Sequence, residues 1–200
     1  MRYRLSFSVG GLFAQEAIVA APRYLQFRDW PAVRAAIDAD NLLQSRTVAS
    51  GRRLSRELVQ RLAELTVEEL ELLLDATAAE RGHLMWVAAC RRYELVGEFA
   101  EEVIRERFLL LTPTLAPEHF ESFVRAKSMW HEELSSLTES TLRKLRTTVF
   151  LMLREAGLLS DLGEILPCVL SPRVADEFEK RAPSDVRFFP TAAPVTGGRR

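Results

Sequence analysis

The segment from residue 41 to residue 65 concentrates the arginine side chains of this sequence. It contains five arginines against two glutamates, a charge of +3, whereas residues 66 to 82 contain five acidic side chains against one arginine, a charge of −4. The five arginines are Arg46, Arg52, Arg53, Arg56 and Arg61. A guanidinium group donates two parallel hydrogen bonds to phosphate oxygens and stays charged at physiological pH. The segment therefore favours binding to the phosphates of nucleic acid.

Helical periodicity assigns several of these arginines to one helix face. A helix is predicted from Thr47 to about Leu65, because leucines recur there at helical spacing, at positions 54, 58, 62 and 65. At about 100° per residue, the side chains of Arg52, Arg53 and Arg56 lie opposite that apolar stripe. The pattern predicts a helix that buries its leucines and presents arginines to solvent.

A second predicted helix, from about Leu137 to Ala156, repeats this arrangement. Its apolar stripe consists of Leu142, Leu145, Val149, Met152, Leu153 and Ala156. The opposite face carries Arg143, Arg146 and Arg154, with Lys144 at its margin. Two helices are therefore expected to offer cationic faces to a polyanion.

The N-terminal residues alternate between apolar and polar side chains, which predicts a short extended arm that carries two more arginines. With this arm, the candidate nucleic-acid-binding residues are Arg2, Arg4, Arg46, Arg52, Arg53, Arg56, Arg143, Lys144 and Arg146. A second interpretation stays open, because amphipathic helices normally expose charged side chains without binding any ligand. The net charge of −1 also differs from the basic character of many nucleic-acid-binding domains.

Other titratable residues lack the spacing of a catalytic or metal-binding site. His83 and Cys90 are seven residues apart on one helix face, roughly 10 Å along its axis, which is too far to bind one metal ion. Glu132 and Glu133 adjoin a histidine, but the sequence has no nucleophile elbow, glycine-rich phosphate loop, Walker motif or H-E-x-x-H motif. Trp130 and Leu134 are four residues apart, and this spacing predicts that the residues around the two glutamates form a helical turn that faces the core. We predict a protein that is not an enzyme and needs no metal or cofactor.

Two neighbouring arginines, Arg91 and Arg92, lie in a stretch that is rich in aromatic residues. We expect them to pair with nearby acids such as Glu94 and Glu98 rather than to bind nucleic acid. The stretch from 81 to 111 is dense enough in apolar residues for two helices at the centre of the core, with Gly97 either at their junction or at a close helix crossing.

The arginine faces depend on a chain that is helical almost throughout. Asp29 is the predicted cap of one helix, and capping-box patterns at residues 66–69 and 136–139 begin two others. The predicted helices cover residues 12–27, 29–40, 47–65, 66–77, two segments within 81–111, a short segment after Pro117, 137–156 and a short segment from Ser171. Residues 165–170 are predicted to pair as a short strand.

These elements predict an all-α fold, a compact multi-helix bundle with a short extended N-terminal arm and an irregular C-terminal tail. Residues 1–182 form the helical domain, either as one unit or as two packed halves that meet near residues 112–117, and residues 183–200 form the extended tail. No apolar run approaches the roughly 20 residues that span a bilayer, and no signal peptide is evident. We expect a cytoplasmic protein without membrane contact, whose two cysteines stay reduced.

Several strings in the sequence resemble the BrxA family of BREX phage-defence systems. The N-terminal strings are Asn41-Leu-Leu-Gln44 with Arg46-Thr47, Trp86 with Cys90-Arg-Arg-Tyr93, and Phe99 followed by Glu102-Val103, Arg105-Glu106 and Phe108. The C-terminal strings are Trp130-His131, Glu133-Leu134, Leu137-Thr138, Ser140-Thr141, Lys144-Leu-Arg146, Met152-Leu-Arg-Glu-Ala-Gly-Leu-Leu159 and Leu170-Ser-Pro-Arg173. The resemblance extends from about Tyr3 to Phe189.

The resemblance implies a helical protein similar to the NusB-like bundles, encoded beside a methyltransferase and an ATPase, that binds DNA. It supplies no agreed set of contacting residues, although Arg46, Lys144 and Arg146 lie in strings of the family. We therefore expect a non-enzymatic accessory component that binds double-stranded DNA mainly through backbone phosphates. The alternative is an adaptor for other BREX proteins, with the acidic and arginine-rich helices as complementary surfaces. RNA binding, as in NusB-like proteins, rests on fold analogy alone.

Overall fold

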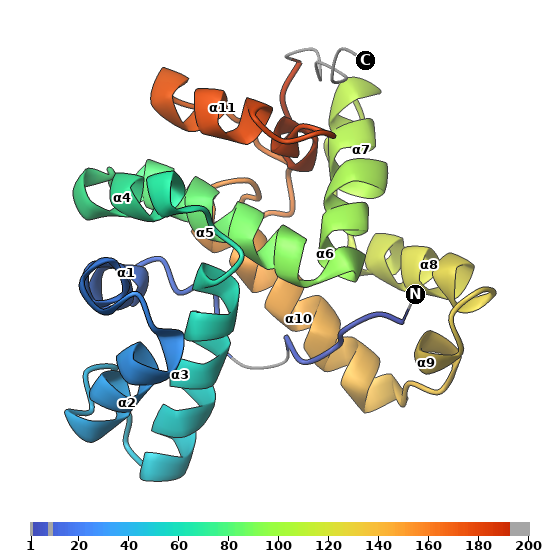
Figure 1. Cartoon of the computed structure of the whole chain (residues 1–200). Helices are drawn as coiled ribbons and strands as arrows, with labels where there is room; N and C mark the ends of the chain where they lie inside the picture. Colours follow the sequence, from blue (N-terminus) through green and yellow to red (C-terminus); the bar gives the residue numbers. More distant parts are fainter. Residues whose placement is uncertain (1, 8–9, 193–200) are drawn as a thin grey trace.

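Helices provide nearly all the regular structure of the protein, seen in a computed structural model that describes residues 2–7 and 10–192 (Figure 1). Within these residues the β contacts are two isolated bridges, Thr114 with Glu164 and Leu159 with Ile165. The predicted all-α fold is confirmed. The short strand predicted at 165–170 is wrong, because Ile165 makes a single bridge and the following residues pair with no strand in the described part of the chain.

The helices follow one another with short connections. In chain order they are α1 (Ala17–Phe27), α2 (Trp30–Ala39), α3 (Val48–Leu62), α4 (Val67–Asp75), α5 (Ala78–Arg92), α6 (Glu94–Phe99), the π-helical turn η1 (Ala100–Arg105), α7 (Glu106–Leu109), α8 (Pro117–Ser128), α9 (Glu132–Ser135), α10 (Glu139–Glu155), α11 (Pro172–Glu179) and the 3-10 turn η2 (Asp185–Phe188). No helix of the described residues is both long and apolar enough to cross a membrane.

Threonine caps fix the start of three successive helices. Thr47, Thr66 and Thr77 each accept a hydrogen bond from the amide three residues later, and the side chain at that later position bonds back to the threonine amide. Such capping boxes satisfy amides that have no partner inside the helix. The box at Thr66 agrees with the sequence prediction, whereas the one at Thr77 with Glu80 was not predicted although its pattern is present.

The core is centred on α5, which crosses α10 in the middle of the molecule (Figure 1). Every residue of α5 from Gly82 to Cys90 is buried. Trp86 is fully buried, and its indole Nε1 donates to the carbonyl of Phe188 at 3.0 Å. Buried tryptophans need such a partner for the indole N–H. The C-terminal segment therefore belongs to the same core as the central helix.

This packing differs from the extended tail predicted from residue 183 onward. Residues 185–188 form η2, and the side chains of Val186, Phe188 and Phe189 are buried. The Phe189 ring stacks on Phe178 of α11 with centroids 5.6 Å apart. The three apolar side chains explain the difference, because their burial outweighs the preference of the surrounding prolines for extended chain. Residues 193–200 of the predicted tail lie outside the described residues.

The starts of two helices differ clearly from the prediction. The first helix begins at Ala17 rather than Leu12, because Phe13 adopts a positive φ of 65° that no helix accommodates. The predicted helix from residue 137 begins at Glu139, where Thr138 and not Ser136 is the cap. Ser136 instead follows the separate short helix α9.

Gly97 lies inside α6, and the junction between α5 and α6 is at Tyr93. A Cβ atom at Gly97 would lie 3.0 Å from the carbonyl oxygen of Cys90 and 3.1 Å from the ring of Phe188. The glycine therefore marks a close approach between α6 and the C-terminal segment, not the boundary of a helix.

Candidate nucleic-acid interface

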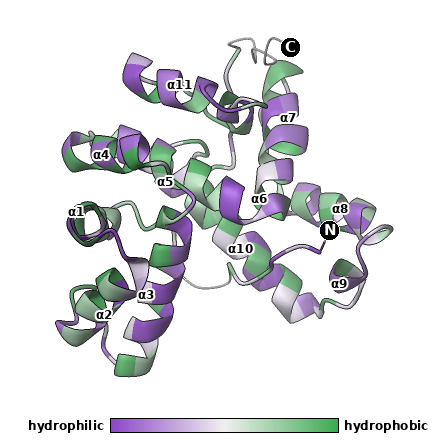
Figure 2. Cartoon of the chain, viewed as in Figure 1, coloured by the Kyte–Doolittle hydropathy of each residue, from purple (hydrophilic) through white to green (hydrophobic). Residues whose placement is uncertain are grey.

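Helix α3 presents three of the predicted arginines to solvent. Its N-cap, Thr47, accepts from the amide of Ser50 at 3.1 Å, and its inner face buries leucines at 58 and 62. Figure 2 shows the resulting mixture of hydrophobic and hydrophilic residues along this helix. Arg52, Arg53 and Arg56 are exposed, and none of them forms an ion pair within residues 2–7 and 10–192. Their guanidinium groups are therefore available to an external anion.

A structured loop adds Arg46 to this surface. The side-chain oxygen of Asn41 accepts from the amide of Ser45 at 2.9 Å, and its amide nitrogen donates to the Ser45 carbonyl at 3.2 Å. Asn41 and Gln44 both adopt positive φ, 45° and 51°, which closes the loop tightly. Arg46 follows this turn, is exposed and has no ion-pair partner among the described residues. The loop therefore holds a fourth free arginine next to the start of α3.

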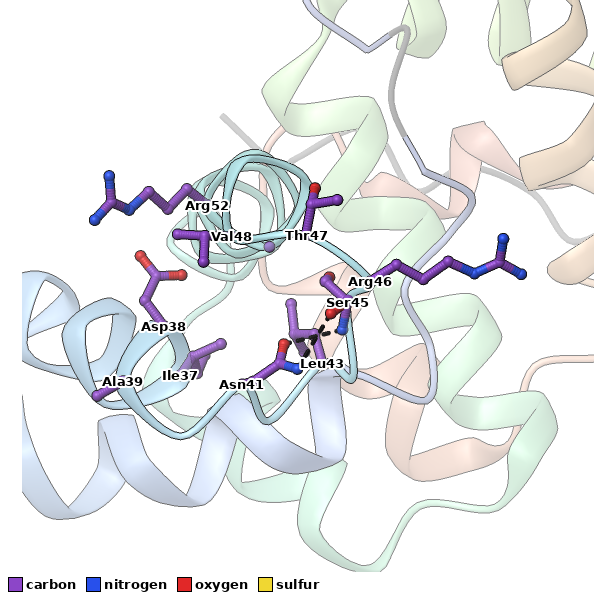
Figure 3. Close-up of a pocket in the computed structure, with 11 residues that line it drawn as sticks. Ile37, Asp38, Ala39, Asn41, Leu43, Ser45, Arg46, Thr47, Val48 and Arg52 are labelled. Atoms are coloured by element: carbon purple, nitrogen blue, oxygen red, sulfur yellow. Dashed lines mark hydrogen bonds between the residues drawn. The ribbon is translucent and has the colours of Figure 1, made fainter.

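A hollow of about 430 Å³ separates Arg46 from Arg52 at the junction of α2 and α3. Figure 3 shows the two side chains leaving this hollow in opposite directions, so their charges are spread over the surface rather than aimed at one point. The carboxylate that lines it, Asp38, accepts from the Ser55 hydroxyl at 2.6 Å and lies 3.8 Å from Arg34. This acid is therefore bound to neighbours other than the candidate arginines.

The fifth arginine of the basic segment, Arg61, is fully buried and differs from the others. Its Nε donates to Glu57 at 2.9 Å, its Nη1 donates to the carbonyl of Gly11 at 2.6 Å, and its guanidinium lies 4.9 Å from the ring centroid of Phe13. Glu57 also accepts from the hydroxyl of Tyr93. Burial, together with the Glu57 charge, raises the pKa of Tyr93 to about 12. Arg61 therefore belongs to a structural network and not to a binding surface.

Helix α10 offers a weaker cationic face than the sequence suggested. Arg143 pairs with Glu139 at 2.7 Å, with side chains 64% and 86% exposed, and Arg146 pairs with Glu121 of α8. Lys144 is exposed and has no ion-pair partner in the described part of the chain. Each paired arginine already has an anion beside it, so its attraction for a phosphate is partly cancelled. Lys144 is the remaining free charge on the predicted face.

The N-terminal arm exposes Arg2 and Arg4 on either side of a buried tyrosine. Tyr3 donates from its amide to Glu133 at 2.6 Å and from its hydroxyl to Glu98 at 2.7 Å. Burial and Glu98 raise the pKa of that hydroxyl well above its usual value. The predicted extended arm agrees with residues 2–7, which form neither helix nor strand, whereas its residues 8 and 9 lie outside the described part. Both arginines lack an ion-pair partner among the described residues.

The candidate residues thus form one group and several outlying positions. Arg46, Arg52, Arg53 and Arg56 lie together on α3 and the loop before it. The two arm arginines and the three candidate cations of α10 lie on other elements, and in Figure 1 α3 lies at the lower left whereas α10 runs from the centre toward the lower right. The largest set of free charges is therefore the α3 group, which we call the α3 arginine face.

The histidines and cysteines make structural contacts. His83 lies 3.5 Å from the thiol of Cys168 rather than near Cys90, and burial raises the pKa of the Cys168 thiol to about 12. His131 lies 3.2 Å from Glu133, whose carboxylate also accepts from the Tyr3 amide. No group of three or more histidines, cysteines and acids within residues 2–7 and 10–192 is arranged to hold a metal ion.

Arg91 is buried in a contact that the sequence prediction assigned to other acids. It pairs with Glu69 of α4 at 2.5 Å and with Asp185 of η2 at 2.7 Å, not with Glu94 or Glu98. The expected partners were neighbours along the chain, whereas the actual ones are brought in by tertiary packing. Arg91 therefore ties the C-terminal segment and α4 to the central helix.

The fold places this chain among the all-α proteins, and its α3 helix carries arginines that have no ion pair among the described residues. The sequence model of the BrxA family matches residues 1–182. This chain belongs to the BrxA family, as the resemblance of its sequence strings indicated.

Two relatives and one solved structure show how far the likeness extends. The chain is 24% identical over 160 residues to a BREX protein BrxA of Paramagnetospirillum magneticum (strain ATCC 700264 / AMB-1), covering 80% of each protein. It is 25% identical over 148 residues to a BREX protein BrxA of Escherichia coli O9:H4 (strain HS), covering 74% of this chain and 70% of that one. A crystal structure of an uncharacterized protein from Magnetospirillum magneticum has the same fold, with a TM-score of 0.80, 22% identity and 90% and 93% coverage of the two chains.

Proposed function

We propose that this protein is a non-enzymatic, cytoplasmic component of a BREX phage-defence system that binds double-stranded DNA through backbone phosphates. The observation that carries the proposal is the α3 arginine face, where four exposed arginines, Arg46, Arg52, Arg53 and Arg56, have no ion pair among the described residues. A protein with a net charge of −1 gains no general attraction for DNA, so its binding depends on such a local group.

Phosphate contacts suit this arrangement of arginines. Each arginine that reaches a phosphate releases a condensed counterion, and this release supplies most affinity that does not depend on DNA sequence. Arg46 and Arg52 extend in opposite directions from the hollow between them, which favours contacts along a backbone over recognition of a single small anion. Lys144 and the two arm arginines are the further cations that we assign to the same ligand. The similarity to NusB-like bundles stays a prediction. RNA binding rests on that similarity, so it stays a prediction as well.

A second candidate function is an adaptor that binds another BREX protein. Three leucines support it, because Leu110, Leu111 and Leu162 are 66%, 88% and 88% exposed. Exposed apolar side chains of this size are typical of protein contacts when they are contiguous. The acidic helix contributes less to such a surface than the sequence suggested, since Glu69 is buried against Arg91.

The test is the fluorescence anisotropy of a labelled random-sequence duplex titrated with the protein at low salt. The variant Arg52→Glu, Arg56→Glu reverses two charges of the α3 arginine face, and the matched control Lys180→Glu, Arg181→Glu makes the same change of charge beyond α11. We expect the first variant to lose binding and the control to keep it, with both melting as the unaltered protein does. Equal losses in both variants, or no binding by the unaltered protein, would contradict the proposal.

Competition separates the remaining possibilities. Unlabelled duplex DNA should displace the labelled duplex at lower concentration than duplex RNA of the same length. Preferential displacement by RNA would favour the NusB-like function instead. Co-elution with a purified BREX protein, together with absent DNA binding, would favour the adaptor.

A further inference from the structure

Trp130 lies on the surface at the corner between α8 and α9, with 84% of the residue exposed. Its neighbour Met129 is 77% exposed. The sequence predicted that Trp130 faces the core, and this prediction is wrong. The backbone is well held at this point, because the amide of Trp130 donates to the carbonyl of Lys127 at 3.0 Å. The side chain is thus displayed by a fixed turn.

The other two tryptophans are placed as expected for large aromatic residues. Trp86 is fully buried, and Trp30 stacks on Tyr24 with ring centroids 4.0 Å apart. Exposing an indole costs the free energy that its burial would provide, about 25 cal/mol for each Å² of apolar surface. A ligand that covers the indole of Trp130 would regain this free energy, and the residues around Trp130 indicate which kind of ligand fits.

A hollow of about 510 Å³ beside Trp130 is lined by Arg2 of the arm and by residues of α9. Arg2 is exposed and forms no ion pair within residues 2–7 and 10–192. The wall of the hollow includes His131, whose ring stacks on Tyr3 with centroids 4.1 Å apart and an angle of 29°. An unpaired cation and a free aromatic face thus lie next to each other on a preformed surface.

The acids of this hollow are Glu132 and Glu133. The Glu133 carboxylate accepts from the Tyr3 amide at 2.6 Å and lies 3.2 Å from His131, and these bonds, the Tyr3 amide first, lower its pKa. Glu132 is exposed and has no ion pair in the described part of the chain. Both carboxylates repel a phosphate, and Glu132 is the one whose charge no partner in the described part of the chain offsets.

The size of the apolar area decides between two kinds of partner. It consists of Met129 and Trp130, while the other large exposed apolar side chains of the described residues lie on different elements. A stable protein interface buries about 800 Å² on each partner, which two adjacent side chains do not supply. A nucleic-acid base needs one aromatic face, and a nearby arginine can bind its phosphate. The local chemistry therefore fits an unpaired base.

We propose that Trp130 stacks on an unpaired DNA base while Arg2 contacts the adjoining phosphate. The protein then binds DNA that contains a single-stranded segment more tightly than a continuous duplex of the same length. This inference rests on the proposed function, because the α3 arginine face supplies the phosphate contacts to the duplex part. Stacking on one base changes affinity by about 5- to 150-fold, since it contributes about 1–3 kcal/mol.

The test compares a continuous duplex with a duplex that carries a short oligothymidine overhang. Trp130→Ala should lower the affinity for the overhang substrate about 5-fold or more and leave the affinity for the continuous duplex unchanged. Trp130→Phe keeps an aromatic face, so its affinity for the overhang substrate should lie between those of Trp130→Ala and the unaltered protein. Glu132→Gln should bind the overhang more tightly than the unaltered protein, because it removes the negative charge beside the phosphate.

Tryptophan fluorescence gives a second, independent measurement. Oligothymidine should quench the emission of the unaltered protein and of Trp30→Phe, and should quench Trp130→Phe much less. If the protein binds the continuous duplex but oligothymidine quenches all three proteins equally, this inference is overturned and the proposed function stays intact. If the unaltered protein binds neither DNA, both are overturned. Trp130→Ala with unchanged DNA affinities but lost co-elution with a BREX protein would assign the tryptophan to a protein contact and overturn the inference.

Discussion

The structure predicts that two pairs of arginines of similar appearance in the sequence contribute unequally to DNA binding. Arg52 and Arg56 on α3 have no ion pair among the described residues, whereas Arg143 and Arg146 on α10 pair with Glu139 and Glu121. The perturbation is to change each pair to glutamine. Glutamine keeps the helix propensity close to that of arginine, so each double variant should fold normally.

The expected magnitude follows from counterion release. Each lost phosphate contact reduces the slope of log K against log salt by about 0.9, so the α3 variant should lose about 1.8 from the slope. At about 0.1 M salt this corresponds to roughly 60-fold weaker binding. The α10 arginines are already paired with Glu139 and Glu121, so few phosphate contacts are lost with them, and we expect a slope change below about 0.9.

The assay is the same anisotropy titration repeated at four or more salt concentrations for the three proteins. We expect nearly parallel lines for the α10 variant and the unaltered protein, and a clearly shallower line for the α3 variant. Equal slopes for both double variants would contradict the unequal contribution of the two arginine pairs. They would mean that the ion pairs seen in the structure do not decide which arginines reach DNA.

Three further predictions concern the fold that carries this surface. Arg91→Met should lower the free energy of unfolding by about 3–5 kcal/mol in urea titrations, because it leaves the buried carboxylate of Glu69 without its cation and leaves Asp185 with Arg187 at 3.9 Å; a loss below about 1 kcal/mol would show that this contact is not buried in solution. Gly97→Ala should destabilise by about 1–3 kcal/mol, since its Cβ would meet a backbone oxygen at 3.0 Å, whereas an increase in melting temperature would show that helix propensity prevails. Hydrogen bonds from Arg173, then Ser171, hold the pKa of Glu80 well below its usual 4.5, so the stability they provide is present above that value and is lost as pH falls below it. Unfolding at pH 3 to 5 should therefore show a smaller pH dependence in Glu80→Gln, and an unchanged dependence would contradict this contribution.

The repeating apolar positions of the sequence predicted which helix faces are buried, and α3 is the clearest case. Its capping threonine, its buried leucines and its exposed arginines at 52, 53 and 56 all agree with the structure. This part of the site depends on local spacing alone, and such spacing is visible in a single sequence. The same holds for the capping box at Thr66.

Contacts between distant parts of the chain could not be predicted in this way. Arg61 lies in the same segment as the exposed arginines, but it is buried because Gly11, fifty residues earlier, lies against it. Arg146 is paired because α8 places Glu121 beside it, and Trp130 is exposed because the chain turns between α8 and α9. Periodicity describes one element at a time, so it does not say which elements meet. The apolar residues Val186, Phe188 and Phe189 did carry a signal for the packed C-terminal segment.

Chemical modification of arginine with and without DNA tests most directly whether the α3 arginine face holds the ligand. Exposed arginines react with phenylglyoxal and the products are located by mass spectrometry, while buried Arg61 serves as the unreactive reference and exposed Arg181, beyond α11, as the reactive one. We expect duplex DNA to protect Arg46, Arg52, Arg53 and Arg56 and to leave Arg181 reactive. Protection of Arg181 with continued reaction across the α3 arginine face would contradict the central claim.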